Sequence, residues 1–213
     1  MILEPVKLPK EKRIFDIIVS IILLILGLPF ILLVLLSMAL EAIFAPSSRG
    51  SVFYTETRIS QGQPFKFYKF RIFKTASLKK HFNECGFVQT KTLEQDGNNL
   101  TFTGRGLKKI YMDELPQLLC VLKGDMTLVG PRPTNVVVSQ QDYNRGQYFR
   151  YLIKCGITGY FQAHKDVRLD KSQAEIDMEY INFVKTNPGW KVVVYDVKIL
   201  LATILTVLRA KGL

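Results

Sequence analysis

The longest apolar segment of the chain lies near its start and predicts a membrane helix. No charged residue occurs from Ile17 to Leu40. A helix of this length can cross a hydrocarbon core of about 30 Å. A signal peptide has a shorter apolar core and a small-residue cleavage site, and neither feature is present. A fully buried helix of a soluble protein is the alternative, which the length and hydrophobicity of the segment disfavour.

The middle of this segment contains Pro29. Proline removes one helical hydrogen bond and clashes with the preceding turn, so we expect a kink or break there. Basic residues flank the segment on both sides, and the positive-inside rule favours both flanks in the cytoplasm. We therefore expect a re-entrant helix that enters the membrane, breaks at Pro29 and returns to the same face; a kinked spanning helix is the alternative. The flanking basic residues are Lys7, Lys10, Lys12 and Arg13 before the segment, and Arg49, Arg58, Lys66 and Lys69 after it.

A second apolar segment runs from Val192 to Leu208 near the C-terminal end. Its start carries Asp196 and Lys198, so an interfacial amphipathic helix or a core helix is expected rather than a membrane span. A carboxylate in an apolar helix needs a partner. Asp196 is therefore either half of a structural ion pair or part of a functional site.

The remaining sequence predicts an α+β fold that is mostly helical. Two short strands, at Phe53-Tyr54 and residues 65–71, flank a turn at residues 61–64 and predict a small β-hairpin. Residues 86–100 are polar and irregular. Helices are expected at residues 74–84, 113–122, 134–150 and 172–185. The first is expected on the membrane surface, and the second is ended by Gly124. In the last, Ile176, Tyr180 and Phe183 share one face.

Composition narrows the classes of function. The 213 residues contain 29 Lys and Arg against 18 Asp and Glu, a formal net charge of +11. This balance indicates an anionic partner: nucleic acid, a phosphate-bearing substrate or an anionic membrane surface. The three cysteines form neither a zinc pattern nor a disulfide framework, and only two histidines are present. A histidine metal site or a Ser-His-Asp triad is therefore hard to build.

The adjacent carboxylates Asp113 and Glu114 are the leading candidates for chemistry. They precede an apolar run, with Pro116 two residues later. Asp113 is expected as a helix N-cap and Glu114 as the first helical residue, where helix N–H groups hold a carboxylate ionised. An ionised carboxylate can act as a nucleophile or bind a metal. The alternative is a plain capping acid.

Three basic residues are candidate phosphate ligands. Arg132 stands between Pro131 and Pro133, which would hold its guanidinium fork rigidly, and the alternative is a tight loop with a solvated arginine. Lys69 and Arg71 lie in the second predicted strand. They either contact a diphosphate or lipid headgroup, or form a solvated strand face.

Taken together, these segments resemble the bacterial sugar transferase family, the small monotopic polyprenyl-phosphate phosphoglycosyl transferases. The resemblance covers nearly the whole chain, and the motifs follow one another in order after the proline-interrupted segment. The motifs begin at Lys12-Arg13-Ile14-Phe15-Asp16 and Lys69-Phe70-Arg71, continue through residues 113–118 and 122–133, and end with Gly156-Ile157-Thr158-Gly159 and Gln162.

The resemblance implies transfer of a phospho-sugar from a UDP-sugar to a polyprenyl (undecaprenyl) phosphate with release of UMP, the first membrane step of glycoconjugate synthesis. Asp113 would be the nucleophile and form a covalent phospho-sugar intermediate. Glu114, with Asp113, would hold Mg²⁺. Lys69, Arg71, Lys108, Arg132 and Asp196 would contribute to the substrate site.

The resemblance also implies a location. Residues 1–45 would form a basic segment and re-entrant helix, and residues 46–213 a catalytic domain on the cytoplasmic leaflet of a bacterial inner (plasma) membrane. Both termini would be cytoplasmic. Whether the chain forms a homodimer stays open, as does the identity of the sugar.

The chain departs from the family pattern at several places, among them a stretch between Asp177 and Asp196 that is longer than usual. Lys108 replaces an arginine before the nucleophile, Cys155 replaces a proline, and Lys165-Asp166 replaces a Gly-Arg pair. Lys108 and the missing Gly-Arg pair lend some support to an alternative, a catalytically inactive membrane-surface protein that binds anionic lipid. The intact Asp113-Glu114 pair and Arg132 argue against it. Nucleic-acid binding is suggested by charge alone; no recognised module supports it, and the membrane segment disfavours it.

Overall fold

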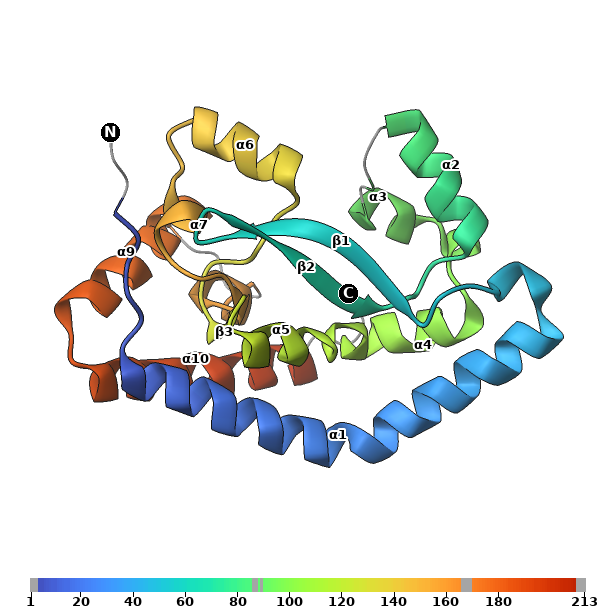
Figure 1. Ribbon diagram of the computed structural model, residues 1–213, viewed down its shortest axis with the longest axis horizontal. Helices are drawn as coiled ribbons and strands as arrows, with labels where there is room; N and C mark the ends of the chain where they lie inside the picture. The colour runs from blue at the N-terminus through green and yellow to red at the C-terminus, as the bar shows by residue number, and fades with distance from the viewer. Residues whose placement is uncertain (1–3, 86–87, 89, 166–169, 210–213) are drawn as a thin grey trace.

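A single long helix, α1 (Lys10–Phe44), runs along one side of the molecule, and the rest of the chain packs against it (Figure 1). The computed structural model describes residues 4–85, 88, 90–165 and 170–209. The other elements follow in chain order: η1 (Pro46–Ser48), β1 (Phe53–Ser60), β2 (Gln63–Phe70), α2 (Thr75–Cys85), α3 (Thr90–Gln95), η2 (Gly97–Asn99), α4 (Phe102–Lys109), η3 (Met112–Glu114), α5 (Gln117–Lys123), β3 (Thr127–Val129), α6 (Val136–Asn144), α7 (Phe149–Leu152), β4 (Gly156–Thr158), α8 (Tyr160–Ala163), α9 (Gln173–Thr186) and α10 (Gly189–Arg209). The expected α+β, mostly helical fold is confirmed.

The long helix bends but does not break. Pro29 lies inside α1, whose helical backbone continues on both sides, and the helix changes direction midway along its length (Figure 1). The expected kink at Pro29 is therefore confirmed, in the form of a bend within one continuous helix. Within the described residues, α1 is the one helix long and apolar enough to cross a bilayer, and only 11% of its most apolar window is buried in the protein.

Both halves of α1 pack on the same body. In the first half, Arg13 donates hydrogen bonds to the carbonyls of Val121 and Leu122 at the end of α5, at 2.6 and 2.9 Å. In the second half, Glu41 accepts from the backbone N–H groups of Phe102 and Thr103 at the start of α4, at 2.6 and 2.9 Å. The helix is thus attached at both ends to one side of the fold.

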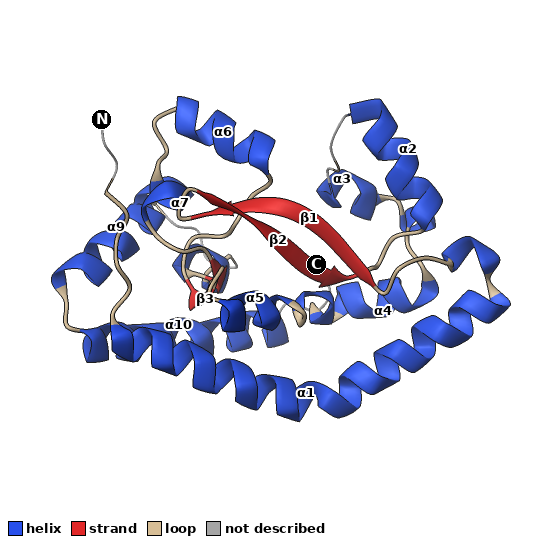
Figure 2. Cartoon of the chain, in the orientation of Figure 1, coloured by secondary structure: helices blue, strands red, loops and turns tan. Residues whose placement is uncertain are grey.

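The predicted hairpin is present and longer than the sequence pattern indicated. Strands β1 and β2 pair antiparallel from Phe53↔Phe70 to Ser60↔Gln63 and form the long red ribbon across the centre of Figure 2. Gln61 and Gly62 make the turn with φ of 51° and 72°. Both φ values belong to a tight hairpin turn, which glycine adopts without steric cost.

A second, parallel pair of strands was not predicted. Strand β3 pairs with β4, with Thr127 opposite Gly156 and Val129 opposite Thr158. A Cβ at Gly156 would lie 2.1 Å from the backbone nitrogen of Gly130. The glycines of two separate motifs therefore serve one purpose, which is to let the two backbones approach closely.

The helices match the sequence pattern unevenly. Helix α9 begins at a capping box of Ser172 and Glu175, as the predicted helix at 172–185 requires. The predicted helix at 134–150 is instead two helices, α6 and α7, and the stretch at 86–100 contains α3 and η2. Helix α4 was not predicted.

The hydrophobic residues form two clusters beneath the hairpin. The larger joins the hairpin to α5, α9 and α10, and the smaller joins the second half of α1 to α3 and α4. The smaller cluster consists of Val34, Met38, Phe70, Ile72, Phe73, Leu93, Leu100 and Leu107. The segment from α4 to α5, which carries the candidate carboxylates, contacts both clusters through Leu115.

Candidate active site

The carboxylate pair lies in a sharp turn between α4 and α5 and not at a helix cap. Tyr111 adopts a left-handed backbone conformation with φ of 55°, and Asp113 and Glu114 follow in the 3₁₀ turn η3. Helix α5 begins only after Pro116, which occupies its N-cap position without a side-chain cap. The prediction that Asp113 caps a helix is therefore wrong, whereas the predicted end at Gly124, with φ of 87°, is correct.

Two cations converge on these carboxylates from distant parts of the chain. The Lys69 ammonium, from the end of β2, lies 3.2 Å from Oδ2 of Asp113 and 2.7 Å from Oε1 of Glu114. A guanidinium nitrogen of Arg132, after β3, lies 2.6 Å from the same Glu114 oxygen. The four charges balance, so an incoming diphosphate would compete with the carboxylates for the two cations.

The two carboxylates differ in their electrostatic surroundings. Burial opposes ionisation of Glu114, but the charges of Arg132 and Lys69 outweigh it and hold the pKa of this carboxyl well below its usual range. Burial raises the pKa of Asp113, and Lys69 opposes that rise only in part while the charge of Glu114 adds to it. Glu114 is thus held in its ionised form, and the ionised form of Asp113 is stabilised less strongly.

The Arg132 loop is fixed by hydrogen bonds to three successive carbonyls. Arg58 donates to the carbonyl of Pro133 at 3.0 Å, and Arg150 donates to the carbonyl of Arg132 at 2.8 Å. The backbone N–H of Gly156 donates to the carbonyl of Pro131 at 2.9 Å. The flanking prolines are therefore only part of the reason that Arg132 points at Glu114.

Arg58 and Arg150 were missed as positioning residues. Arg58 counted in the sequence only as a basic residue flanking the membrane segment. In the structure it is buried, and its guanidinium lies 3.8 Å from the ring centre of Phe67. Its neighbours in the sequence, Thr57 and Ile59 among them, gave no clear signal of this burial. A buried guanidinium needs acceptors for its hydrogen bonds, and these come from distant parts of the chain.

Arg71 is not brought to the carboxylate pair. Its side chain is buried and donates to the carbonyls of Ser48, Ser51 and Phe73, each at 2.7 Å. These bonds tie the segment that follows α1 to the end of the hairpin. In this arrangement the Arg71 guanidinium is engaged by backbone oxygens.

Lys108 lies beside the site and is held by α3. Its ammonium donates to the carbonyl of Glu94 at 2.8 Å and lies 3.9 Å from the carboxylate of the same residue. Burial raises the pKa of Glu94, while Lys69 and Lys108 oppose the rise. A third carboxylate therefore borders the pair on the α3 side.

Asp196 lies in a buried ionic network that joins α10 to α1. Its carboxylate is 2.5 Å from the ammonium of Lys12 and accepts a hydrogen bond from the Tyr180 hydroxyl at 2.8 Å. Lys12 and Asp196 are both fully buried. This arrangement matches the structural ion pair that the sequence left open as one of two alternatives.

The same network reaches the strand that leads to the Arg132 loop. The ammonium of Lys12 donates to the carbonyl of Val129 at 3.1 Å. Asp16 accepts from the Thr127 hydroxyl at 2.5 Å. Lys12, which the sequence indicated only as a basic residue flanking the membrane segment, and Asp16 thus anchor β3.

The remaining departures from the family pattern lie apart from the pair or outside the described residues. Cys155 is fully buried, and its Sγ lies 3.4 Å from the carbonyl of Ile59. Asp166 falls outside the described residues. Gln162 is buried, with its Oε1 lacking a hydrogen-bond partner among the described residues.

The donor set around the pair fits a hard divalent cation bound together with substrate. Within the described residues no group of three or more His, Cys, Asp and Glu side chains forms a metal site. Mg²⁺ commonly takes only one or two carboxylates and completes its shell with phosphates and water. The ion pairs engage Oδ2 of Asp113 and Oε1 of Glu114, so the second oxygen of each carboxylate lies outside these pairs.

Comparison with known proteins gives an independent view of the chain. Residues 9–210 match the model of a family described as bacterial sugar transferase. The match contains every element from α1 to α10 in full, and with them the whole carboxylate site.

Among curated relatives, a UDP-N-acetylgalactosamine-undecaprenyl-phosphate N-acetylgalactosaminephosphotransferase of Aeromonas hydrophila is 32% identical over 206 residues, covering 94% of this chain and 44% of the relative. A UDP-glucose:undecaprenyl-phosphate glucose-1-phosphate transferase of Escherichia coli K12 is 32% identical over 203 residues, covering 91% of this chain and 39% of the relative. The chain thus spans less than half the length of these two relatives. The uncharacterized sugar transferase EpsL of Bacillus subtilis is 34% identical over 204 residues, which cover 95% of this chain and 89% of that protein.

Proposed function

The chain belongs to the bacterial sugar transferase family, and we propose that it transfers a sugar phosphate from a UDP-sugar to undecaprenyl phosphate, with release of UMP, as a step of polysaccharide synthesis. The observation that carries this proposal is the cluster of Asp113, Glu114, Lys69 and Arg132. Phosphoryl transfer needs a positioned nucleophile and cations against the developing phosphate charge. The relatives from Aeromonas and Escherichia, named for this reaction with two different sugars, support the substrate classes.

Asp113 is the proposed nucleophile. Its carboxylate attacks the β-phosphorus of the donor, the bond from that phosphorus to the bridging oxygen breaks, and UMP leaves with the electron pair. The sugar phosphate then remains on Asp113 as an acyl phosphate. Attack by the acceptor phosphate on the same phosphorus releases the carboxylate and forms the lipid diphosphate sugar.

The ion pairs support this division of roles between the two carboxylates. Glu114 is held by two cations, at 2.7 and 2.6 Å, so it is poorly placed to leave them. Asp113 has one cation contact, at 3.2 Å, and is the freer of the two. Lys69 and Arg132 then serve the phosphate charge that develops during transfer.

Mg²⁺ is part of the proposal. The carboxylate oxygens of Asp113 and Glu114 that lie outside the ion pairs would hold it, and when bound it would neutralise diphosphate charge. Titration of the purified protein with Mg²⁺, followed by the release of UMP, tests this. Equal rates with Mg²⁺ and with excess chelator would remove the metal from the proposal.

We further propose that the protein is monotopic on the cytoplasmic leaflet, as expected for residues 1–45 and 46–213. Because both halves of α1 pack on the same folded body, a bilayer can meet only the outer side of the bend. The outer sides of α1 and α10 carry exposed apolar residues that suit this contact: Ile18, Ile22, Ile25, Leu26, Leu32, Trp190, Leu201, Ile204, Leu205 and Leu208.

Cysteine labelling tests this orientation. Cysteines placed one at a time at Pro5 and Ser47, in a Cys85→Ser background that keeps the buried Cys120 and Cys155, report on the two ends of α1. Ser47 is preferable to Gly50, where a Cβ would lie 2.4 Å from the Thr75 hydroxyl oxygen. An impermeant reagent added outside intact cells should label neither position; labelling at one end only would mean that α1 spans the membrane.

The activity itself is tested by the release of UMP from a panel of UDP-sugars with undecaprenyl phosphate. We expect release with at least one sugar, and loss of release in Asp113→Asn. Asp170→Asn, an exposed carboxylate elsewhere on the domain, is the matched control and should keep the activity. If the wild-type protein releases no UMP from any sugar, the enzyme proposal fails and the alternative of an inactive lipid-binding protein gains.

A further inference from the structure

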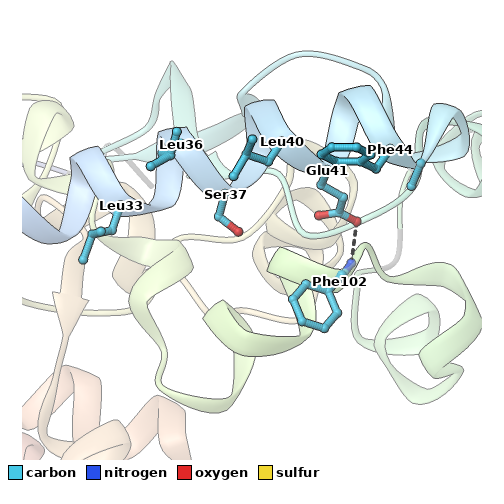
Figure 3. A pocket seen from close by; sticks show the side chains of 8 residues that line it. Leu33, Leu36, Ser37, Leu40, Glu41, Phe44 and Phe102 are labelled. Atoms are coloured by element: carbon cyan, nitrogen blue, oxygen red, sulfur yellow. Dashed lines mark hydrogen bonds between the residues drawn. The ribbon is translucent and has the colours of Figure 1, made fainter.

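A groove of about 410 Å³ lies between the second half of α1 and the start of α4, away from the ion-pair cluster. Its walls are largely apolar, and Figure 3 shows Ser37 and Glu41 projecting from α1 toward the start of α4. The lining residues are Leu33, Leu36, Ser37, Leu40, Glu41, Phe44, Ala45 and Phe102. The groove opens onto the exposed apolar side of α1.

The polar groups of the groove are already satisfied. The Glu41 carboxylate accepts from the backbone N–H groups of Phe102 and Thr103, and from the Ser48 hydroxyl at 2.8 Å. Ser37 and Thr103 share a hydrogen bond of 2.8 Å. No Lys or Arg is among the lining residues, and the one charged group is an anion. The groove therefore disfavours a phosphate headgroup and suits a hydrocarbon chain.

Helix α4 connects the groove to the carboxylate pair. Phe102, at its first position, lines the groove, and Asp113 follows shortly after its last residue, Lys109. A helix of this length rises by about 12 Å. Residues four apart lie on the same side of a helix, so Phe102, Gly106 and Ile110 form one exposed strip along it. A Cβ at Gly106 would have no atom within 4 Å, so the space above the middle of the strip is open.

We propose that the isoprenoid chain of the acceptor lipid lies along this strip and enters the groove between α1 and α4, while its phosphate is at Asp113. This inference rests on the proposed function and adds a binding site for the acceptor chain. The phosphate of the acceptor needs the cations near the last turn of α4. Its isoprenoid chain needs the apolar groove at the first turn of α4, which holds no cation. A phospholipid carries its phosphate as a diester between glycerol and the headgroup, so it is not an acceptor in this reaction and would not be held in this register.

Kinetics with acceptors of different length test the groove. Leu36→Trp fills it, and Leu32→Trp is the matched control, because the two leucines are 57% and 58% exposed and only Leu36 lines the groove. The bilayer is itself apolar, so the chain gains packing contacts rather than hydrophobic transfer. We expect Leu36→Trp to raise the KM for undecaprenyl phosphate roughly fivefold, with little change for a ten-carbon acceptor. We expect Leu32→Trp to leave both values as in the wild type.

Gly106→Leu provides a second test that does not depend on packing in the groove. The open space at Gly106 accepts the side chain, and leucine favours a helix more than glycine. The leucine obstructs the strip, so the KM for the long acceptor should again rise while UMP formation from the donor without acceptor stays unchanged. If both variants match Leu32→Trp for all acceptors, the groove assignment is wrong and the transferase proposal is untouched. If the wild-type protein shows no transfer to any acceptor, the proposed function fails instead.

Photo-crosslinking identifies the occupant. A polyprenyl phosphate with a diazirine several isoprene units from the phosphate should label Leu36, Leu40 or Phe102, and unlabelled undecaprenyl phosphate should compete. A phosphatidylglycerol with a diazirine in its acyl chain serves as the second probe. Equal labelling of these residues by both probes, without competition, would mean that the groove holds bulk lipid and would overturn the proposal.

Discussion

The buried ion pair between Lys12 and Asp196 gives a quantitative prediction about what holds α1 to the fold. Lys12→Met keeps the length of the side chain and removes its charge. The ammonium lies 2.5 Å from Asp196 and 3.8 Å from Asp16, so the substitution leaves two fully buried carboxylates without their cation. It also removes the hydrogen bond to the carbonyl of Val129.

The expected loss follows from burial. Removing one partner of a buried ion pair costs about 3–5 kcal/mol, because the remaining charge is left without compensation. With two carboxylates affected, we expect about 4 kcal/mol. For a chain of this size that lowers the Tm by roughly 10 °C. Lys10→Met, an exposed lysine on the same helix, is the matched control and should change stability by less than about 0.5 kcal/mol.

The assay is thermal unfolding of the protein in nanodiscs, with a double-mutant cycle. Adding Asp196→Asn to Lys12→Met removes one of the two uncompensated charges and should recover about 2 kcal/mol. If Lys12→Met unfolds within 2 °C of Lys10→Met, the network does not stabilise the fold. If the two substitutions are simply additive, the pair is not coupled, and Asp196 would need another role.

Three further predictions concern other parts of the structure. Arg58→Lys should lower the rate of UMP release about tenfold, while the Tm falls by only a few degrees. The reason is that a lysine cannot donate to the Pro133 carbonyl and to Glu56 at the same time, as the guanidinium does. Unchanged kinetics would show that this arginine does not position Arg132. Burial raises the pKa of Asp177 to about 7, so the folded state holds a proton there that the unfolded state has lost. This contribution to stability is present at pH 5 and is lost as the pH rises to 8, by about 2.5 kcal/mol; Asp177→Asn should remove that part of the slope of stability against pH, and an unchanged slope would contradict the assignment. Gly156→Ala should prevent pairing of β3 with β4 and lower the yield of folded protein strongly, whereas Gly97→Ala, where a Cβ meets nothing within 4 Å, should not; equal yields would contradict the close approach.

The parts of the fold that were predictable are those with a long or local signal. The apolar run from Ile17 to Leu40 is long enough to identify a helix from composition alone. The capping box at Ser172 and the left-handed Gly124 each depend on a few neighbouring residues, so a local pattern indicates them. Strands β3 and β4 are too short to show a period of two, so their pairing appears only in three dimensions.

The candidate site divides in the same way. The residue pattern and the motif resemblance together identified Asp113, Glu114, Lys69 and Arg132, and the structure brings these four together. The sequence does not show which basic residues face the carboxylate pair. Arg71 lies two residues after Lys69, and the alternation of a strand does not predict that backbone carbonyls accept hydrogen bonds from its guanidinium. The partner of Asp196 is 184 positions away in the sequence, a distance over which no local pattern carries information.

The central claim is that Asp113 accepts the sugar phosphate, and an acid quench tests it most directly. The protein is mixed with a UDP-sugar labelled at the β-phosphorus, without acceptor, and the label on the denatured chain is located by peptide mapping. The account predicts label on the peptide containing Asp113, in proportion to the UMP released, removed by undecaprenyl phosphate and absent in Asp113→Asn. Release of UMP with no label on the protein, or label on another residue, would contradict it.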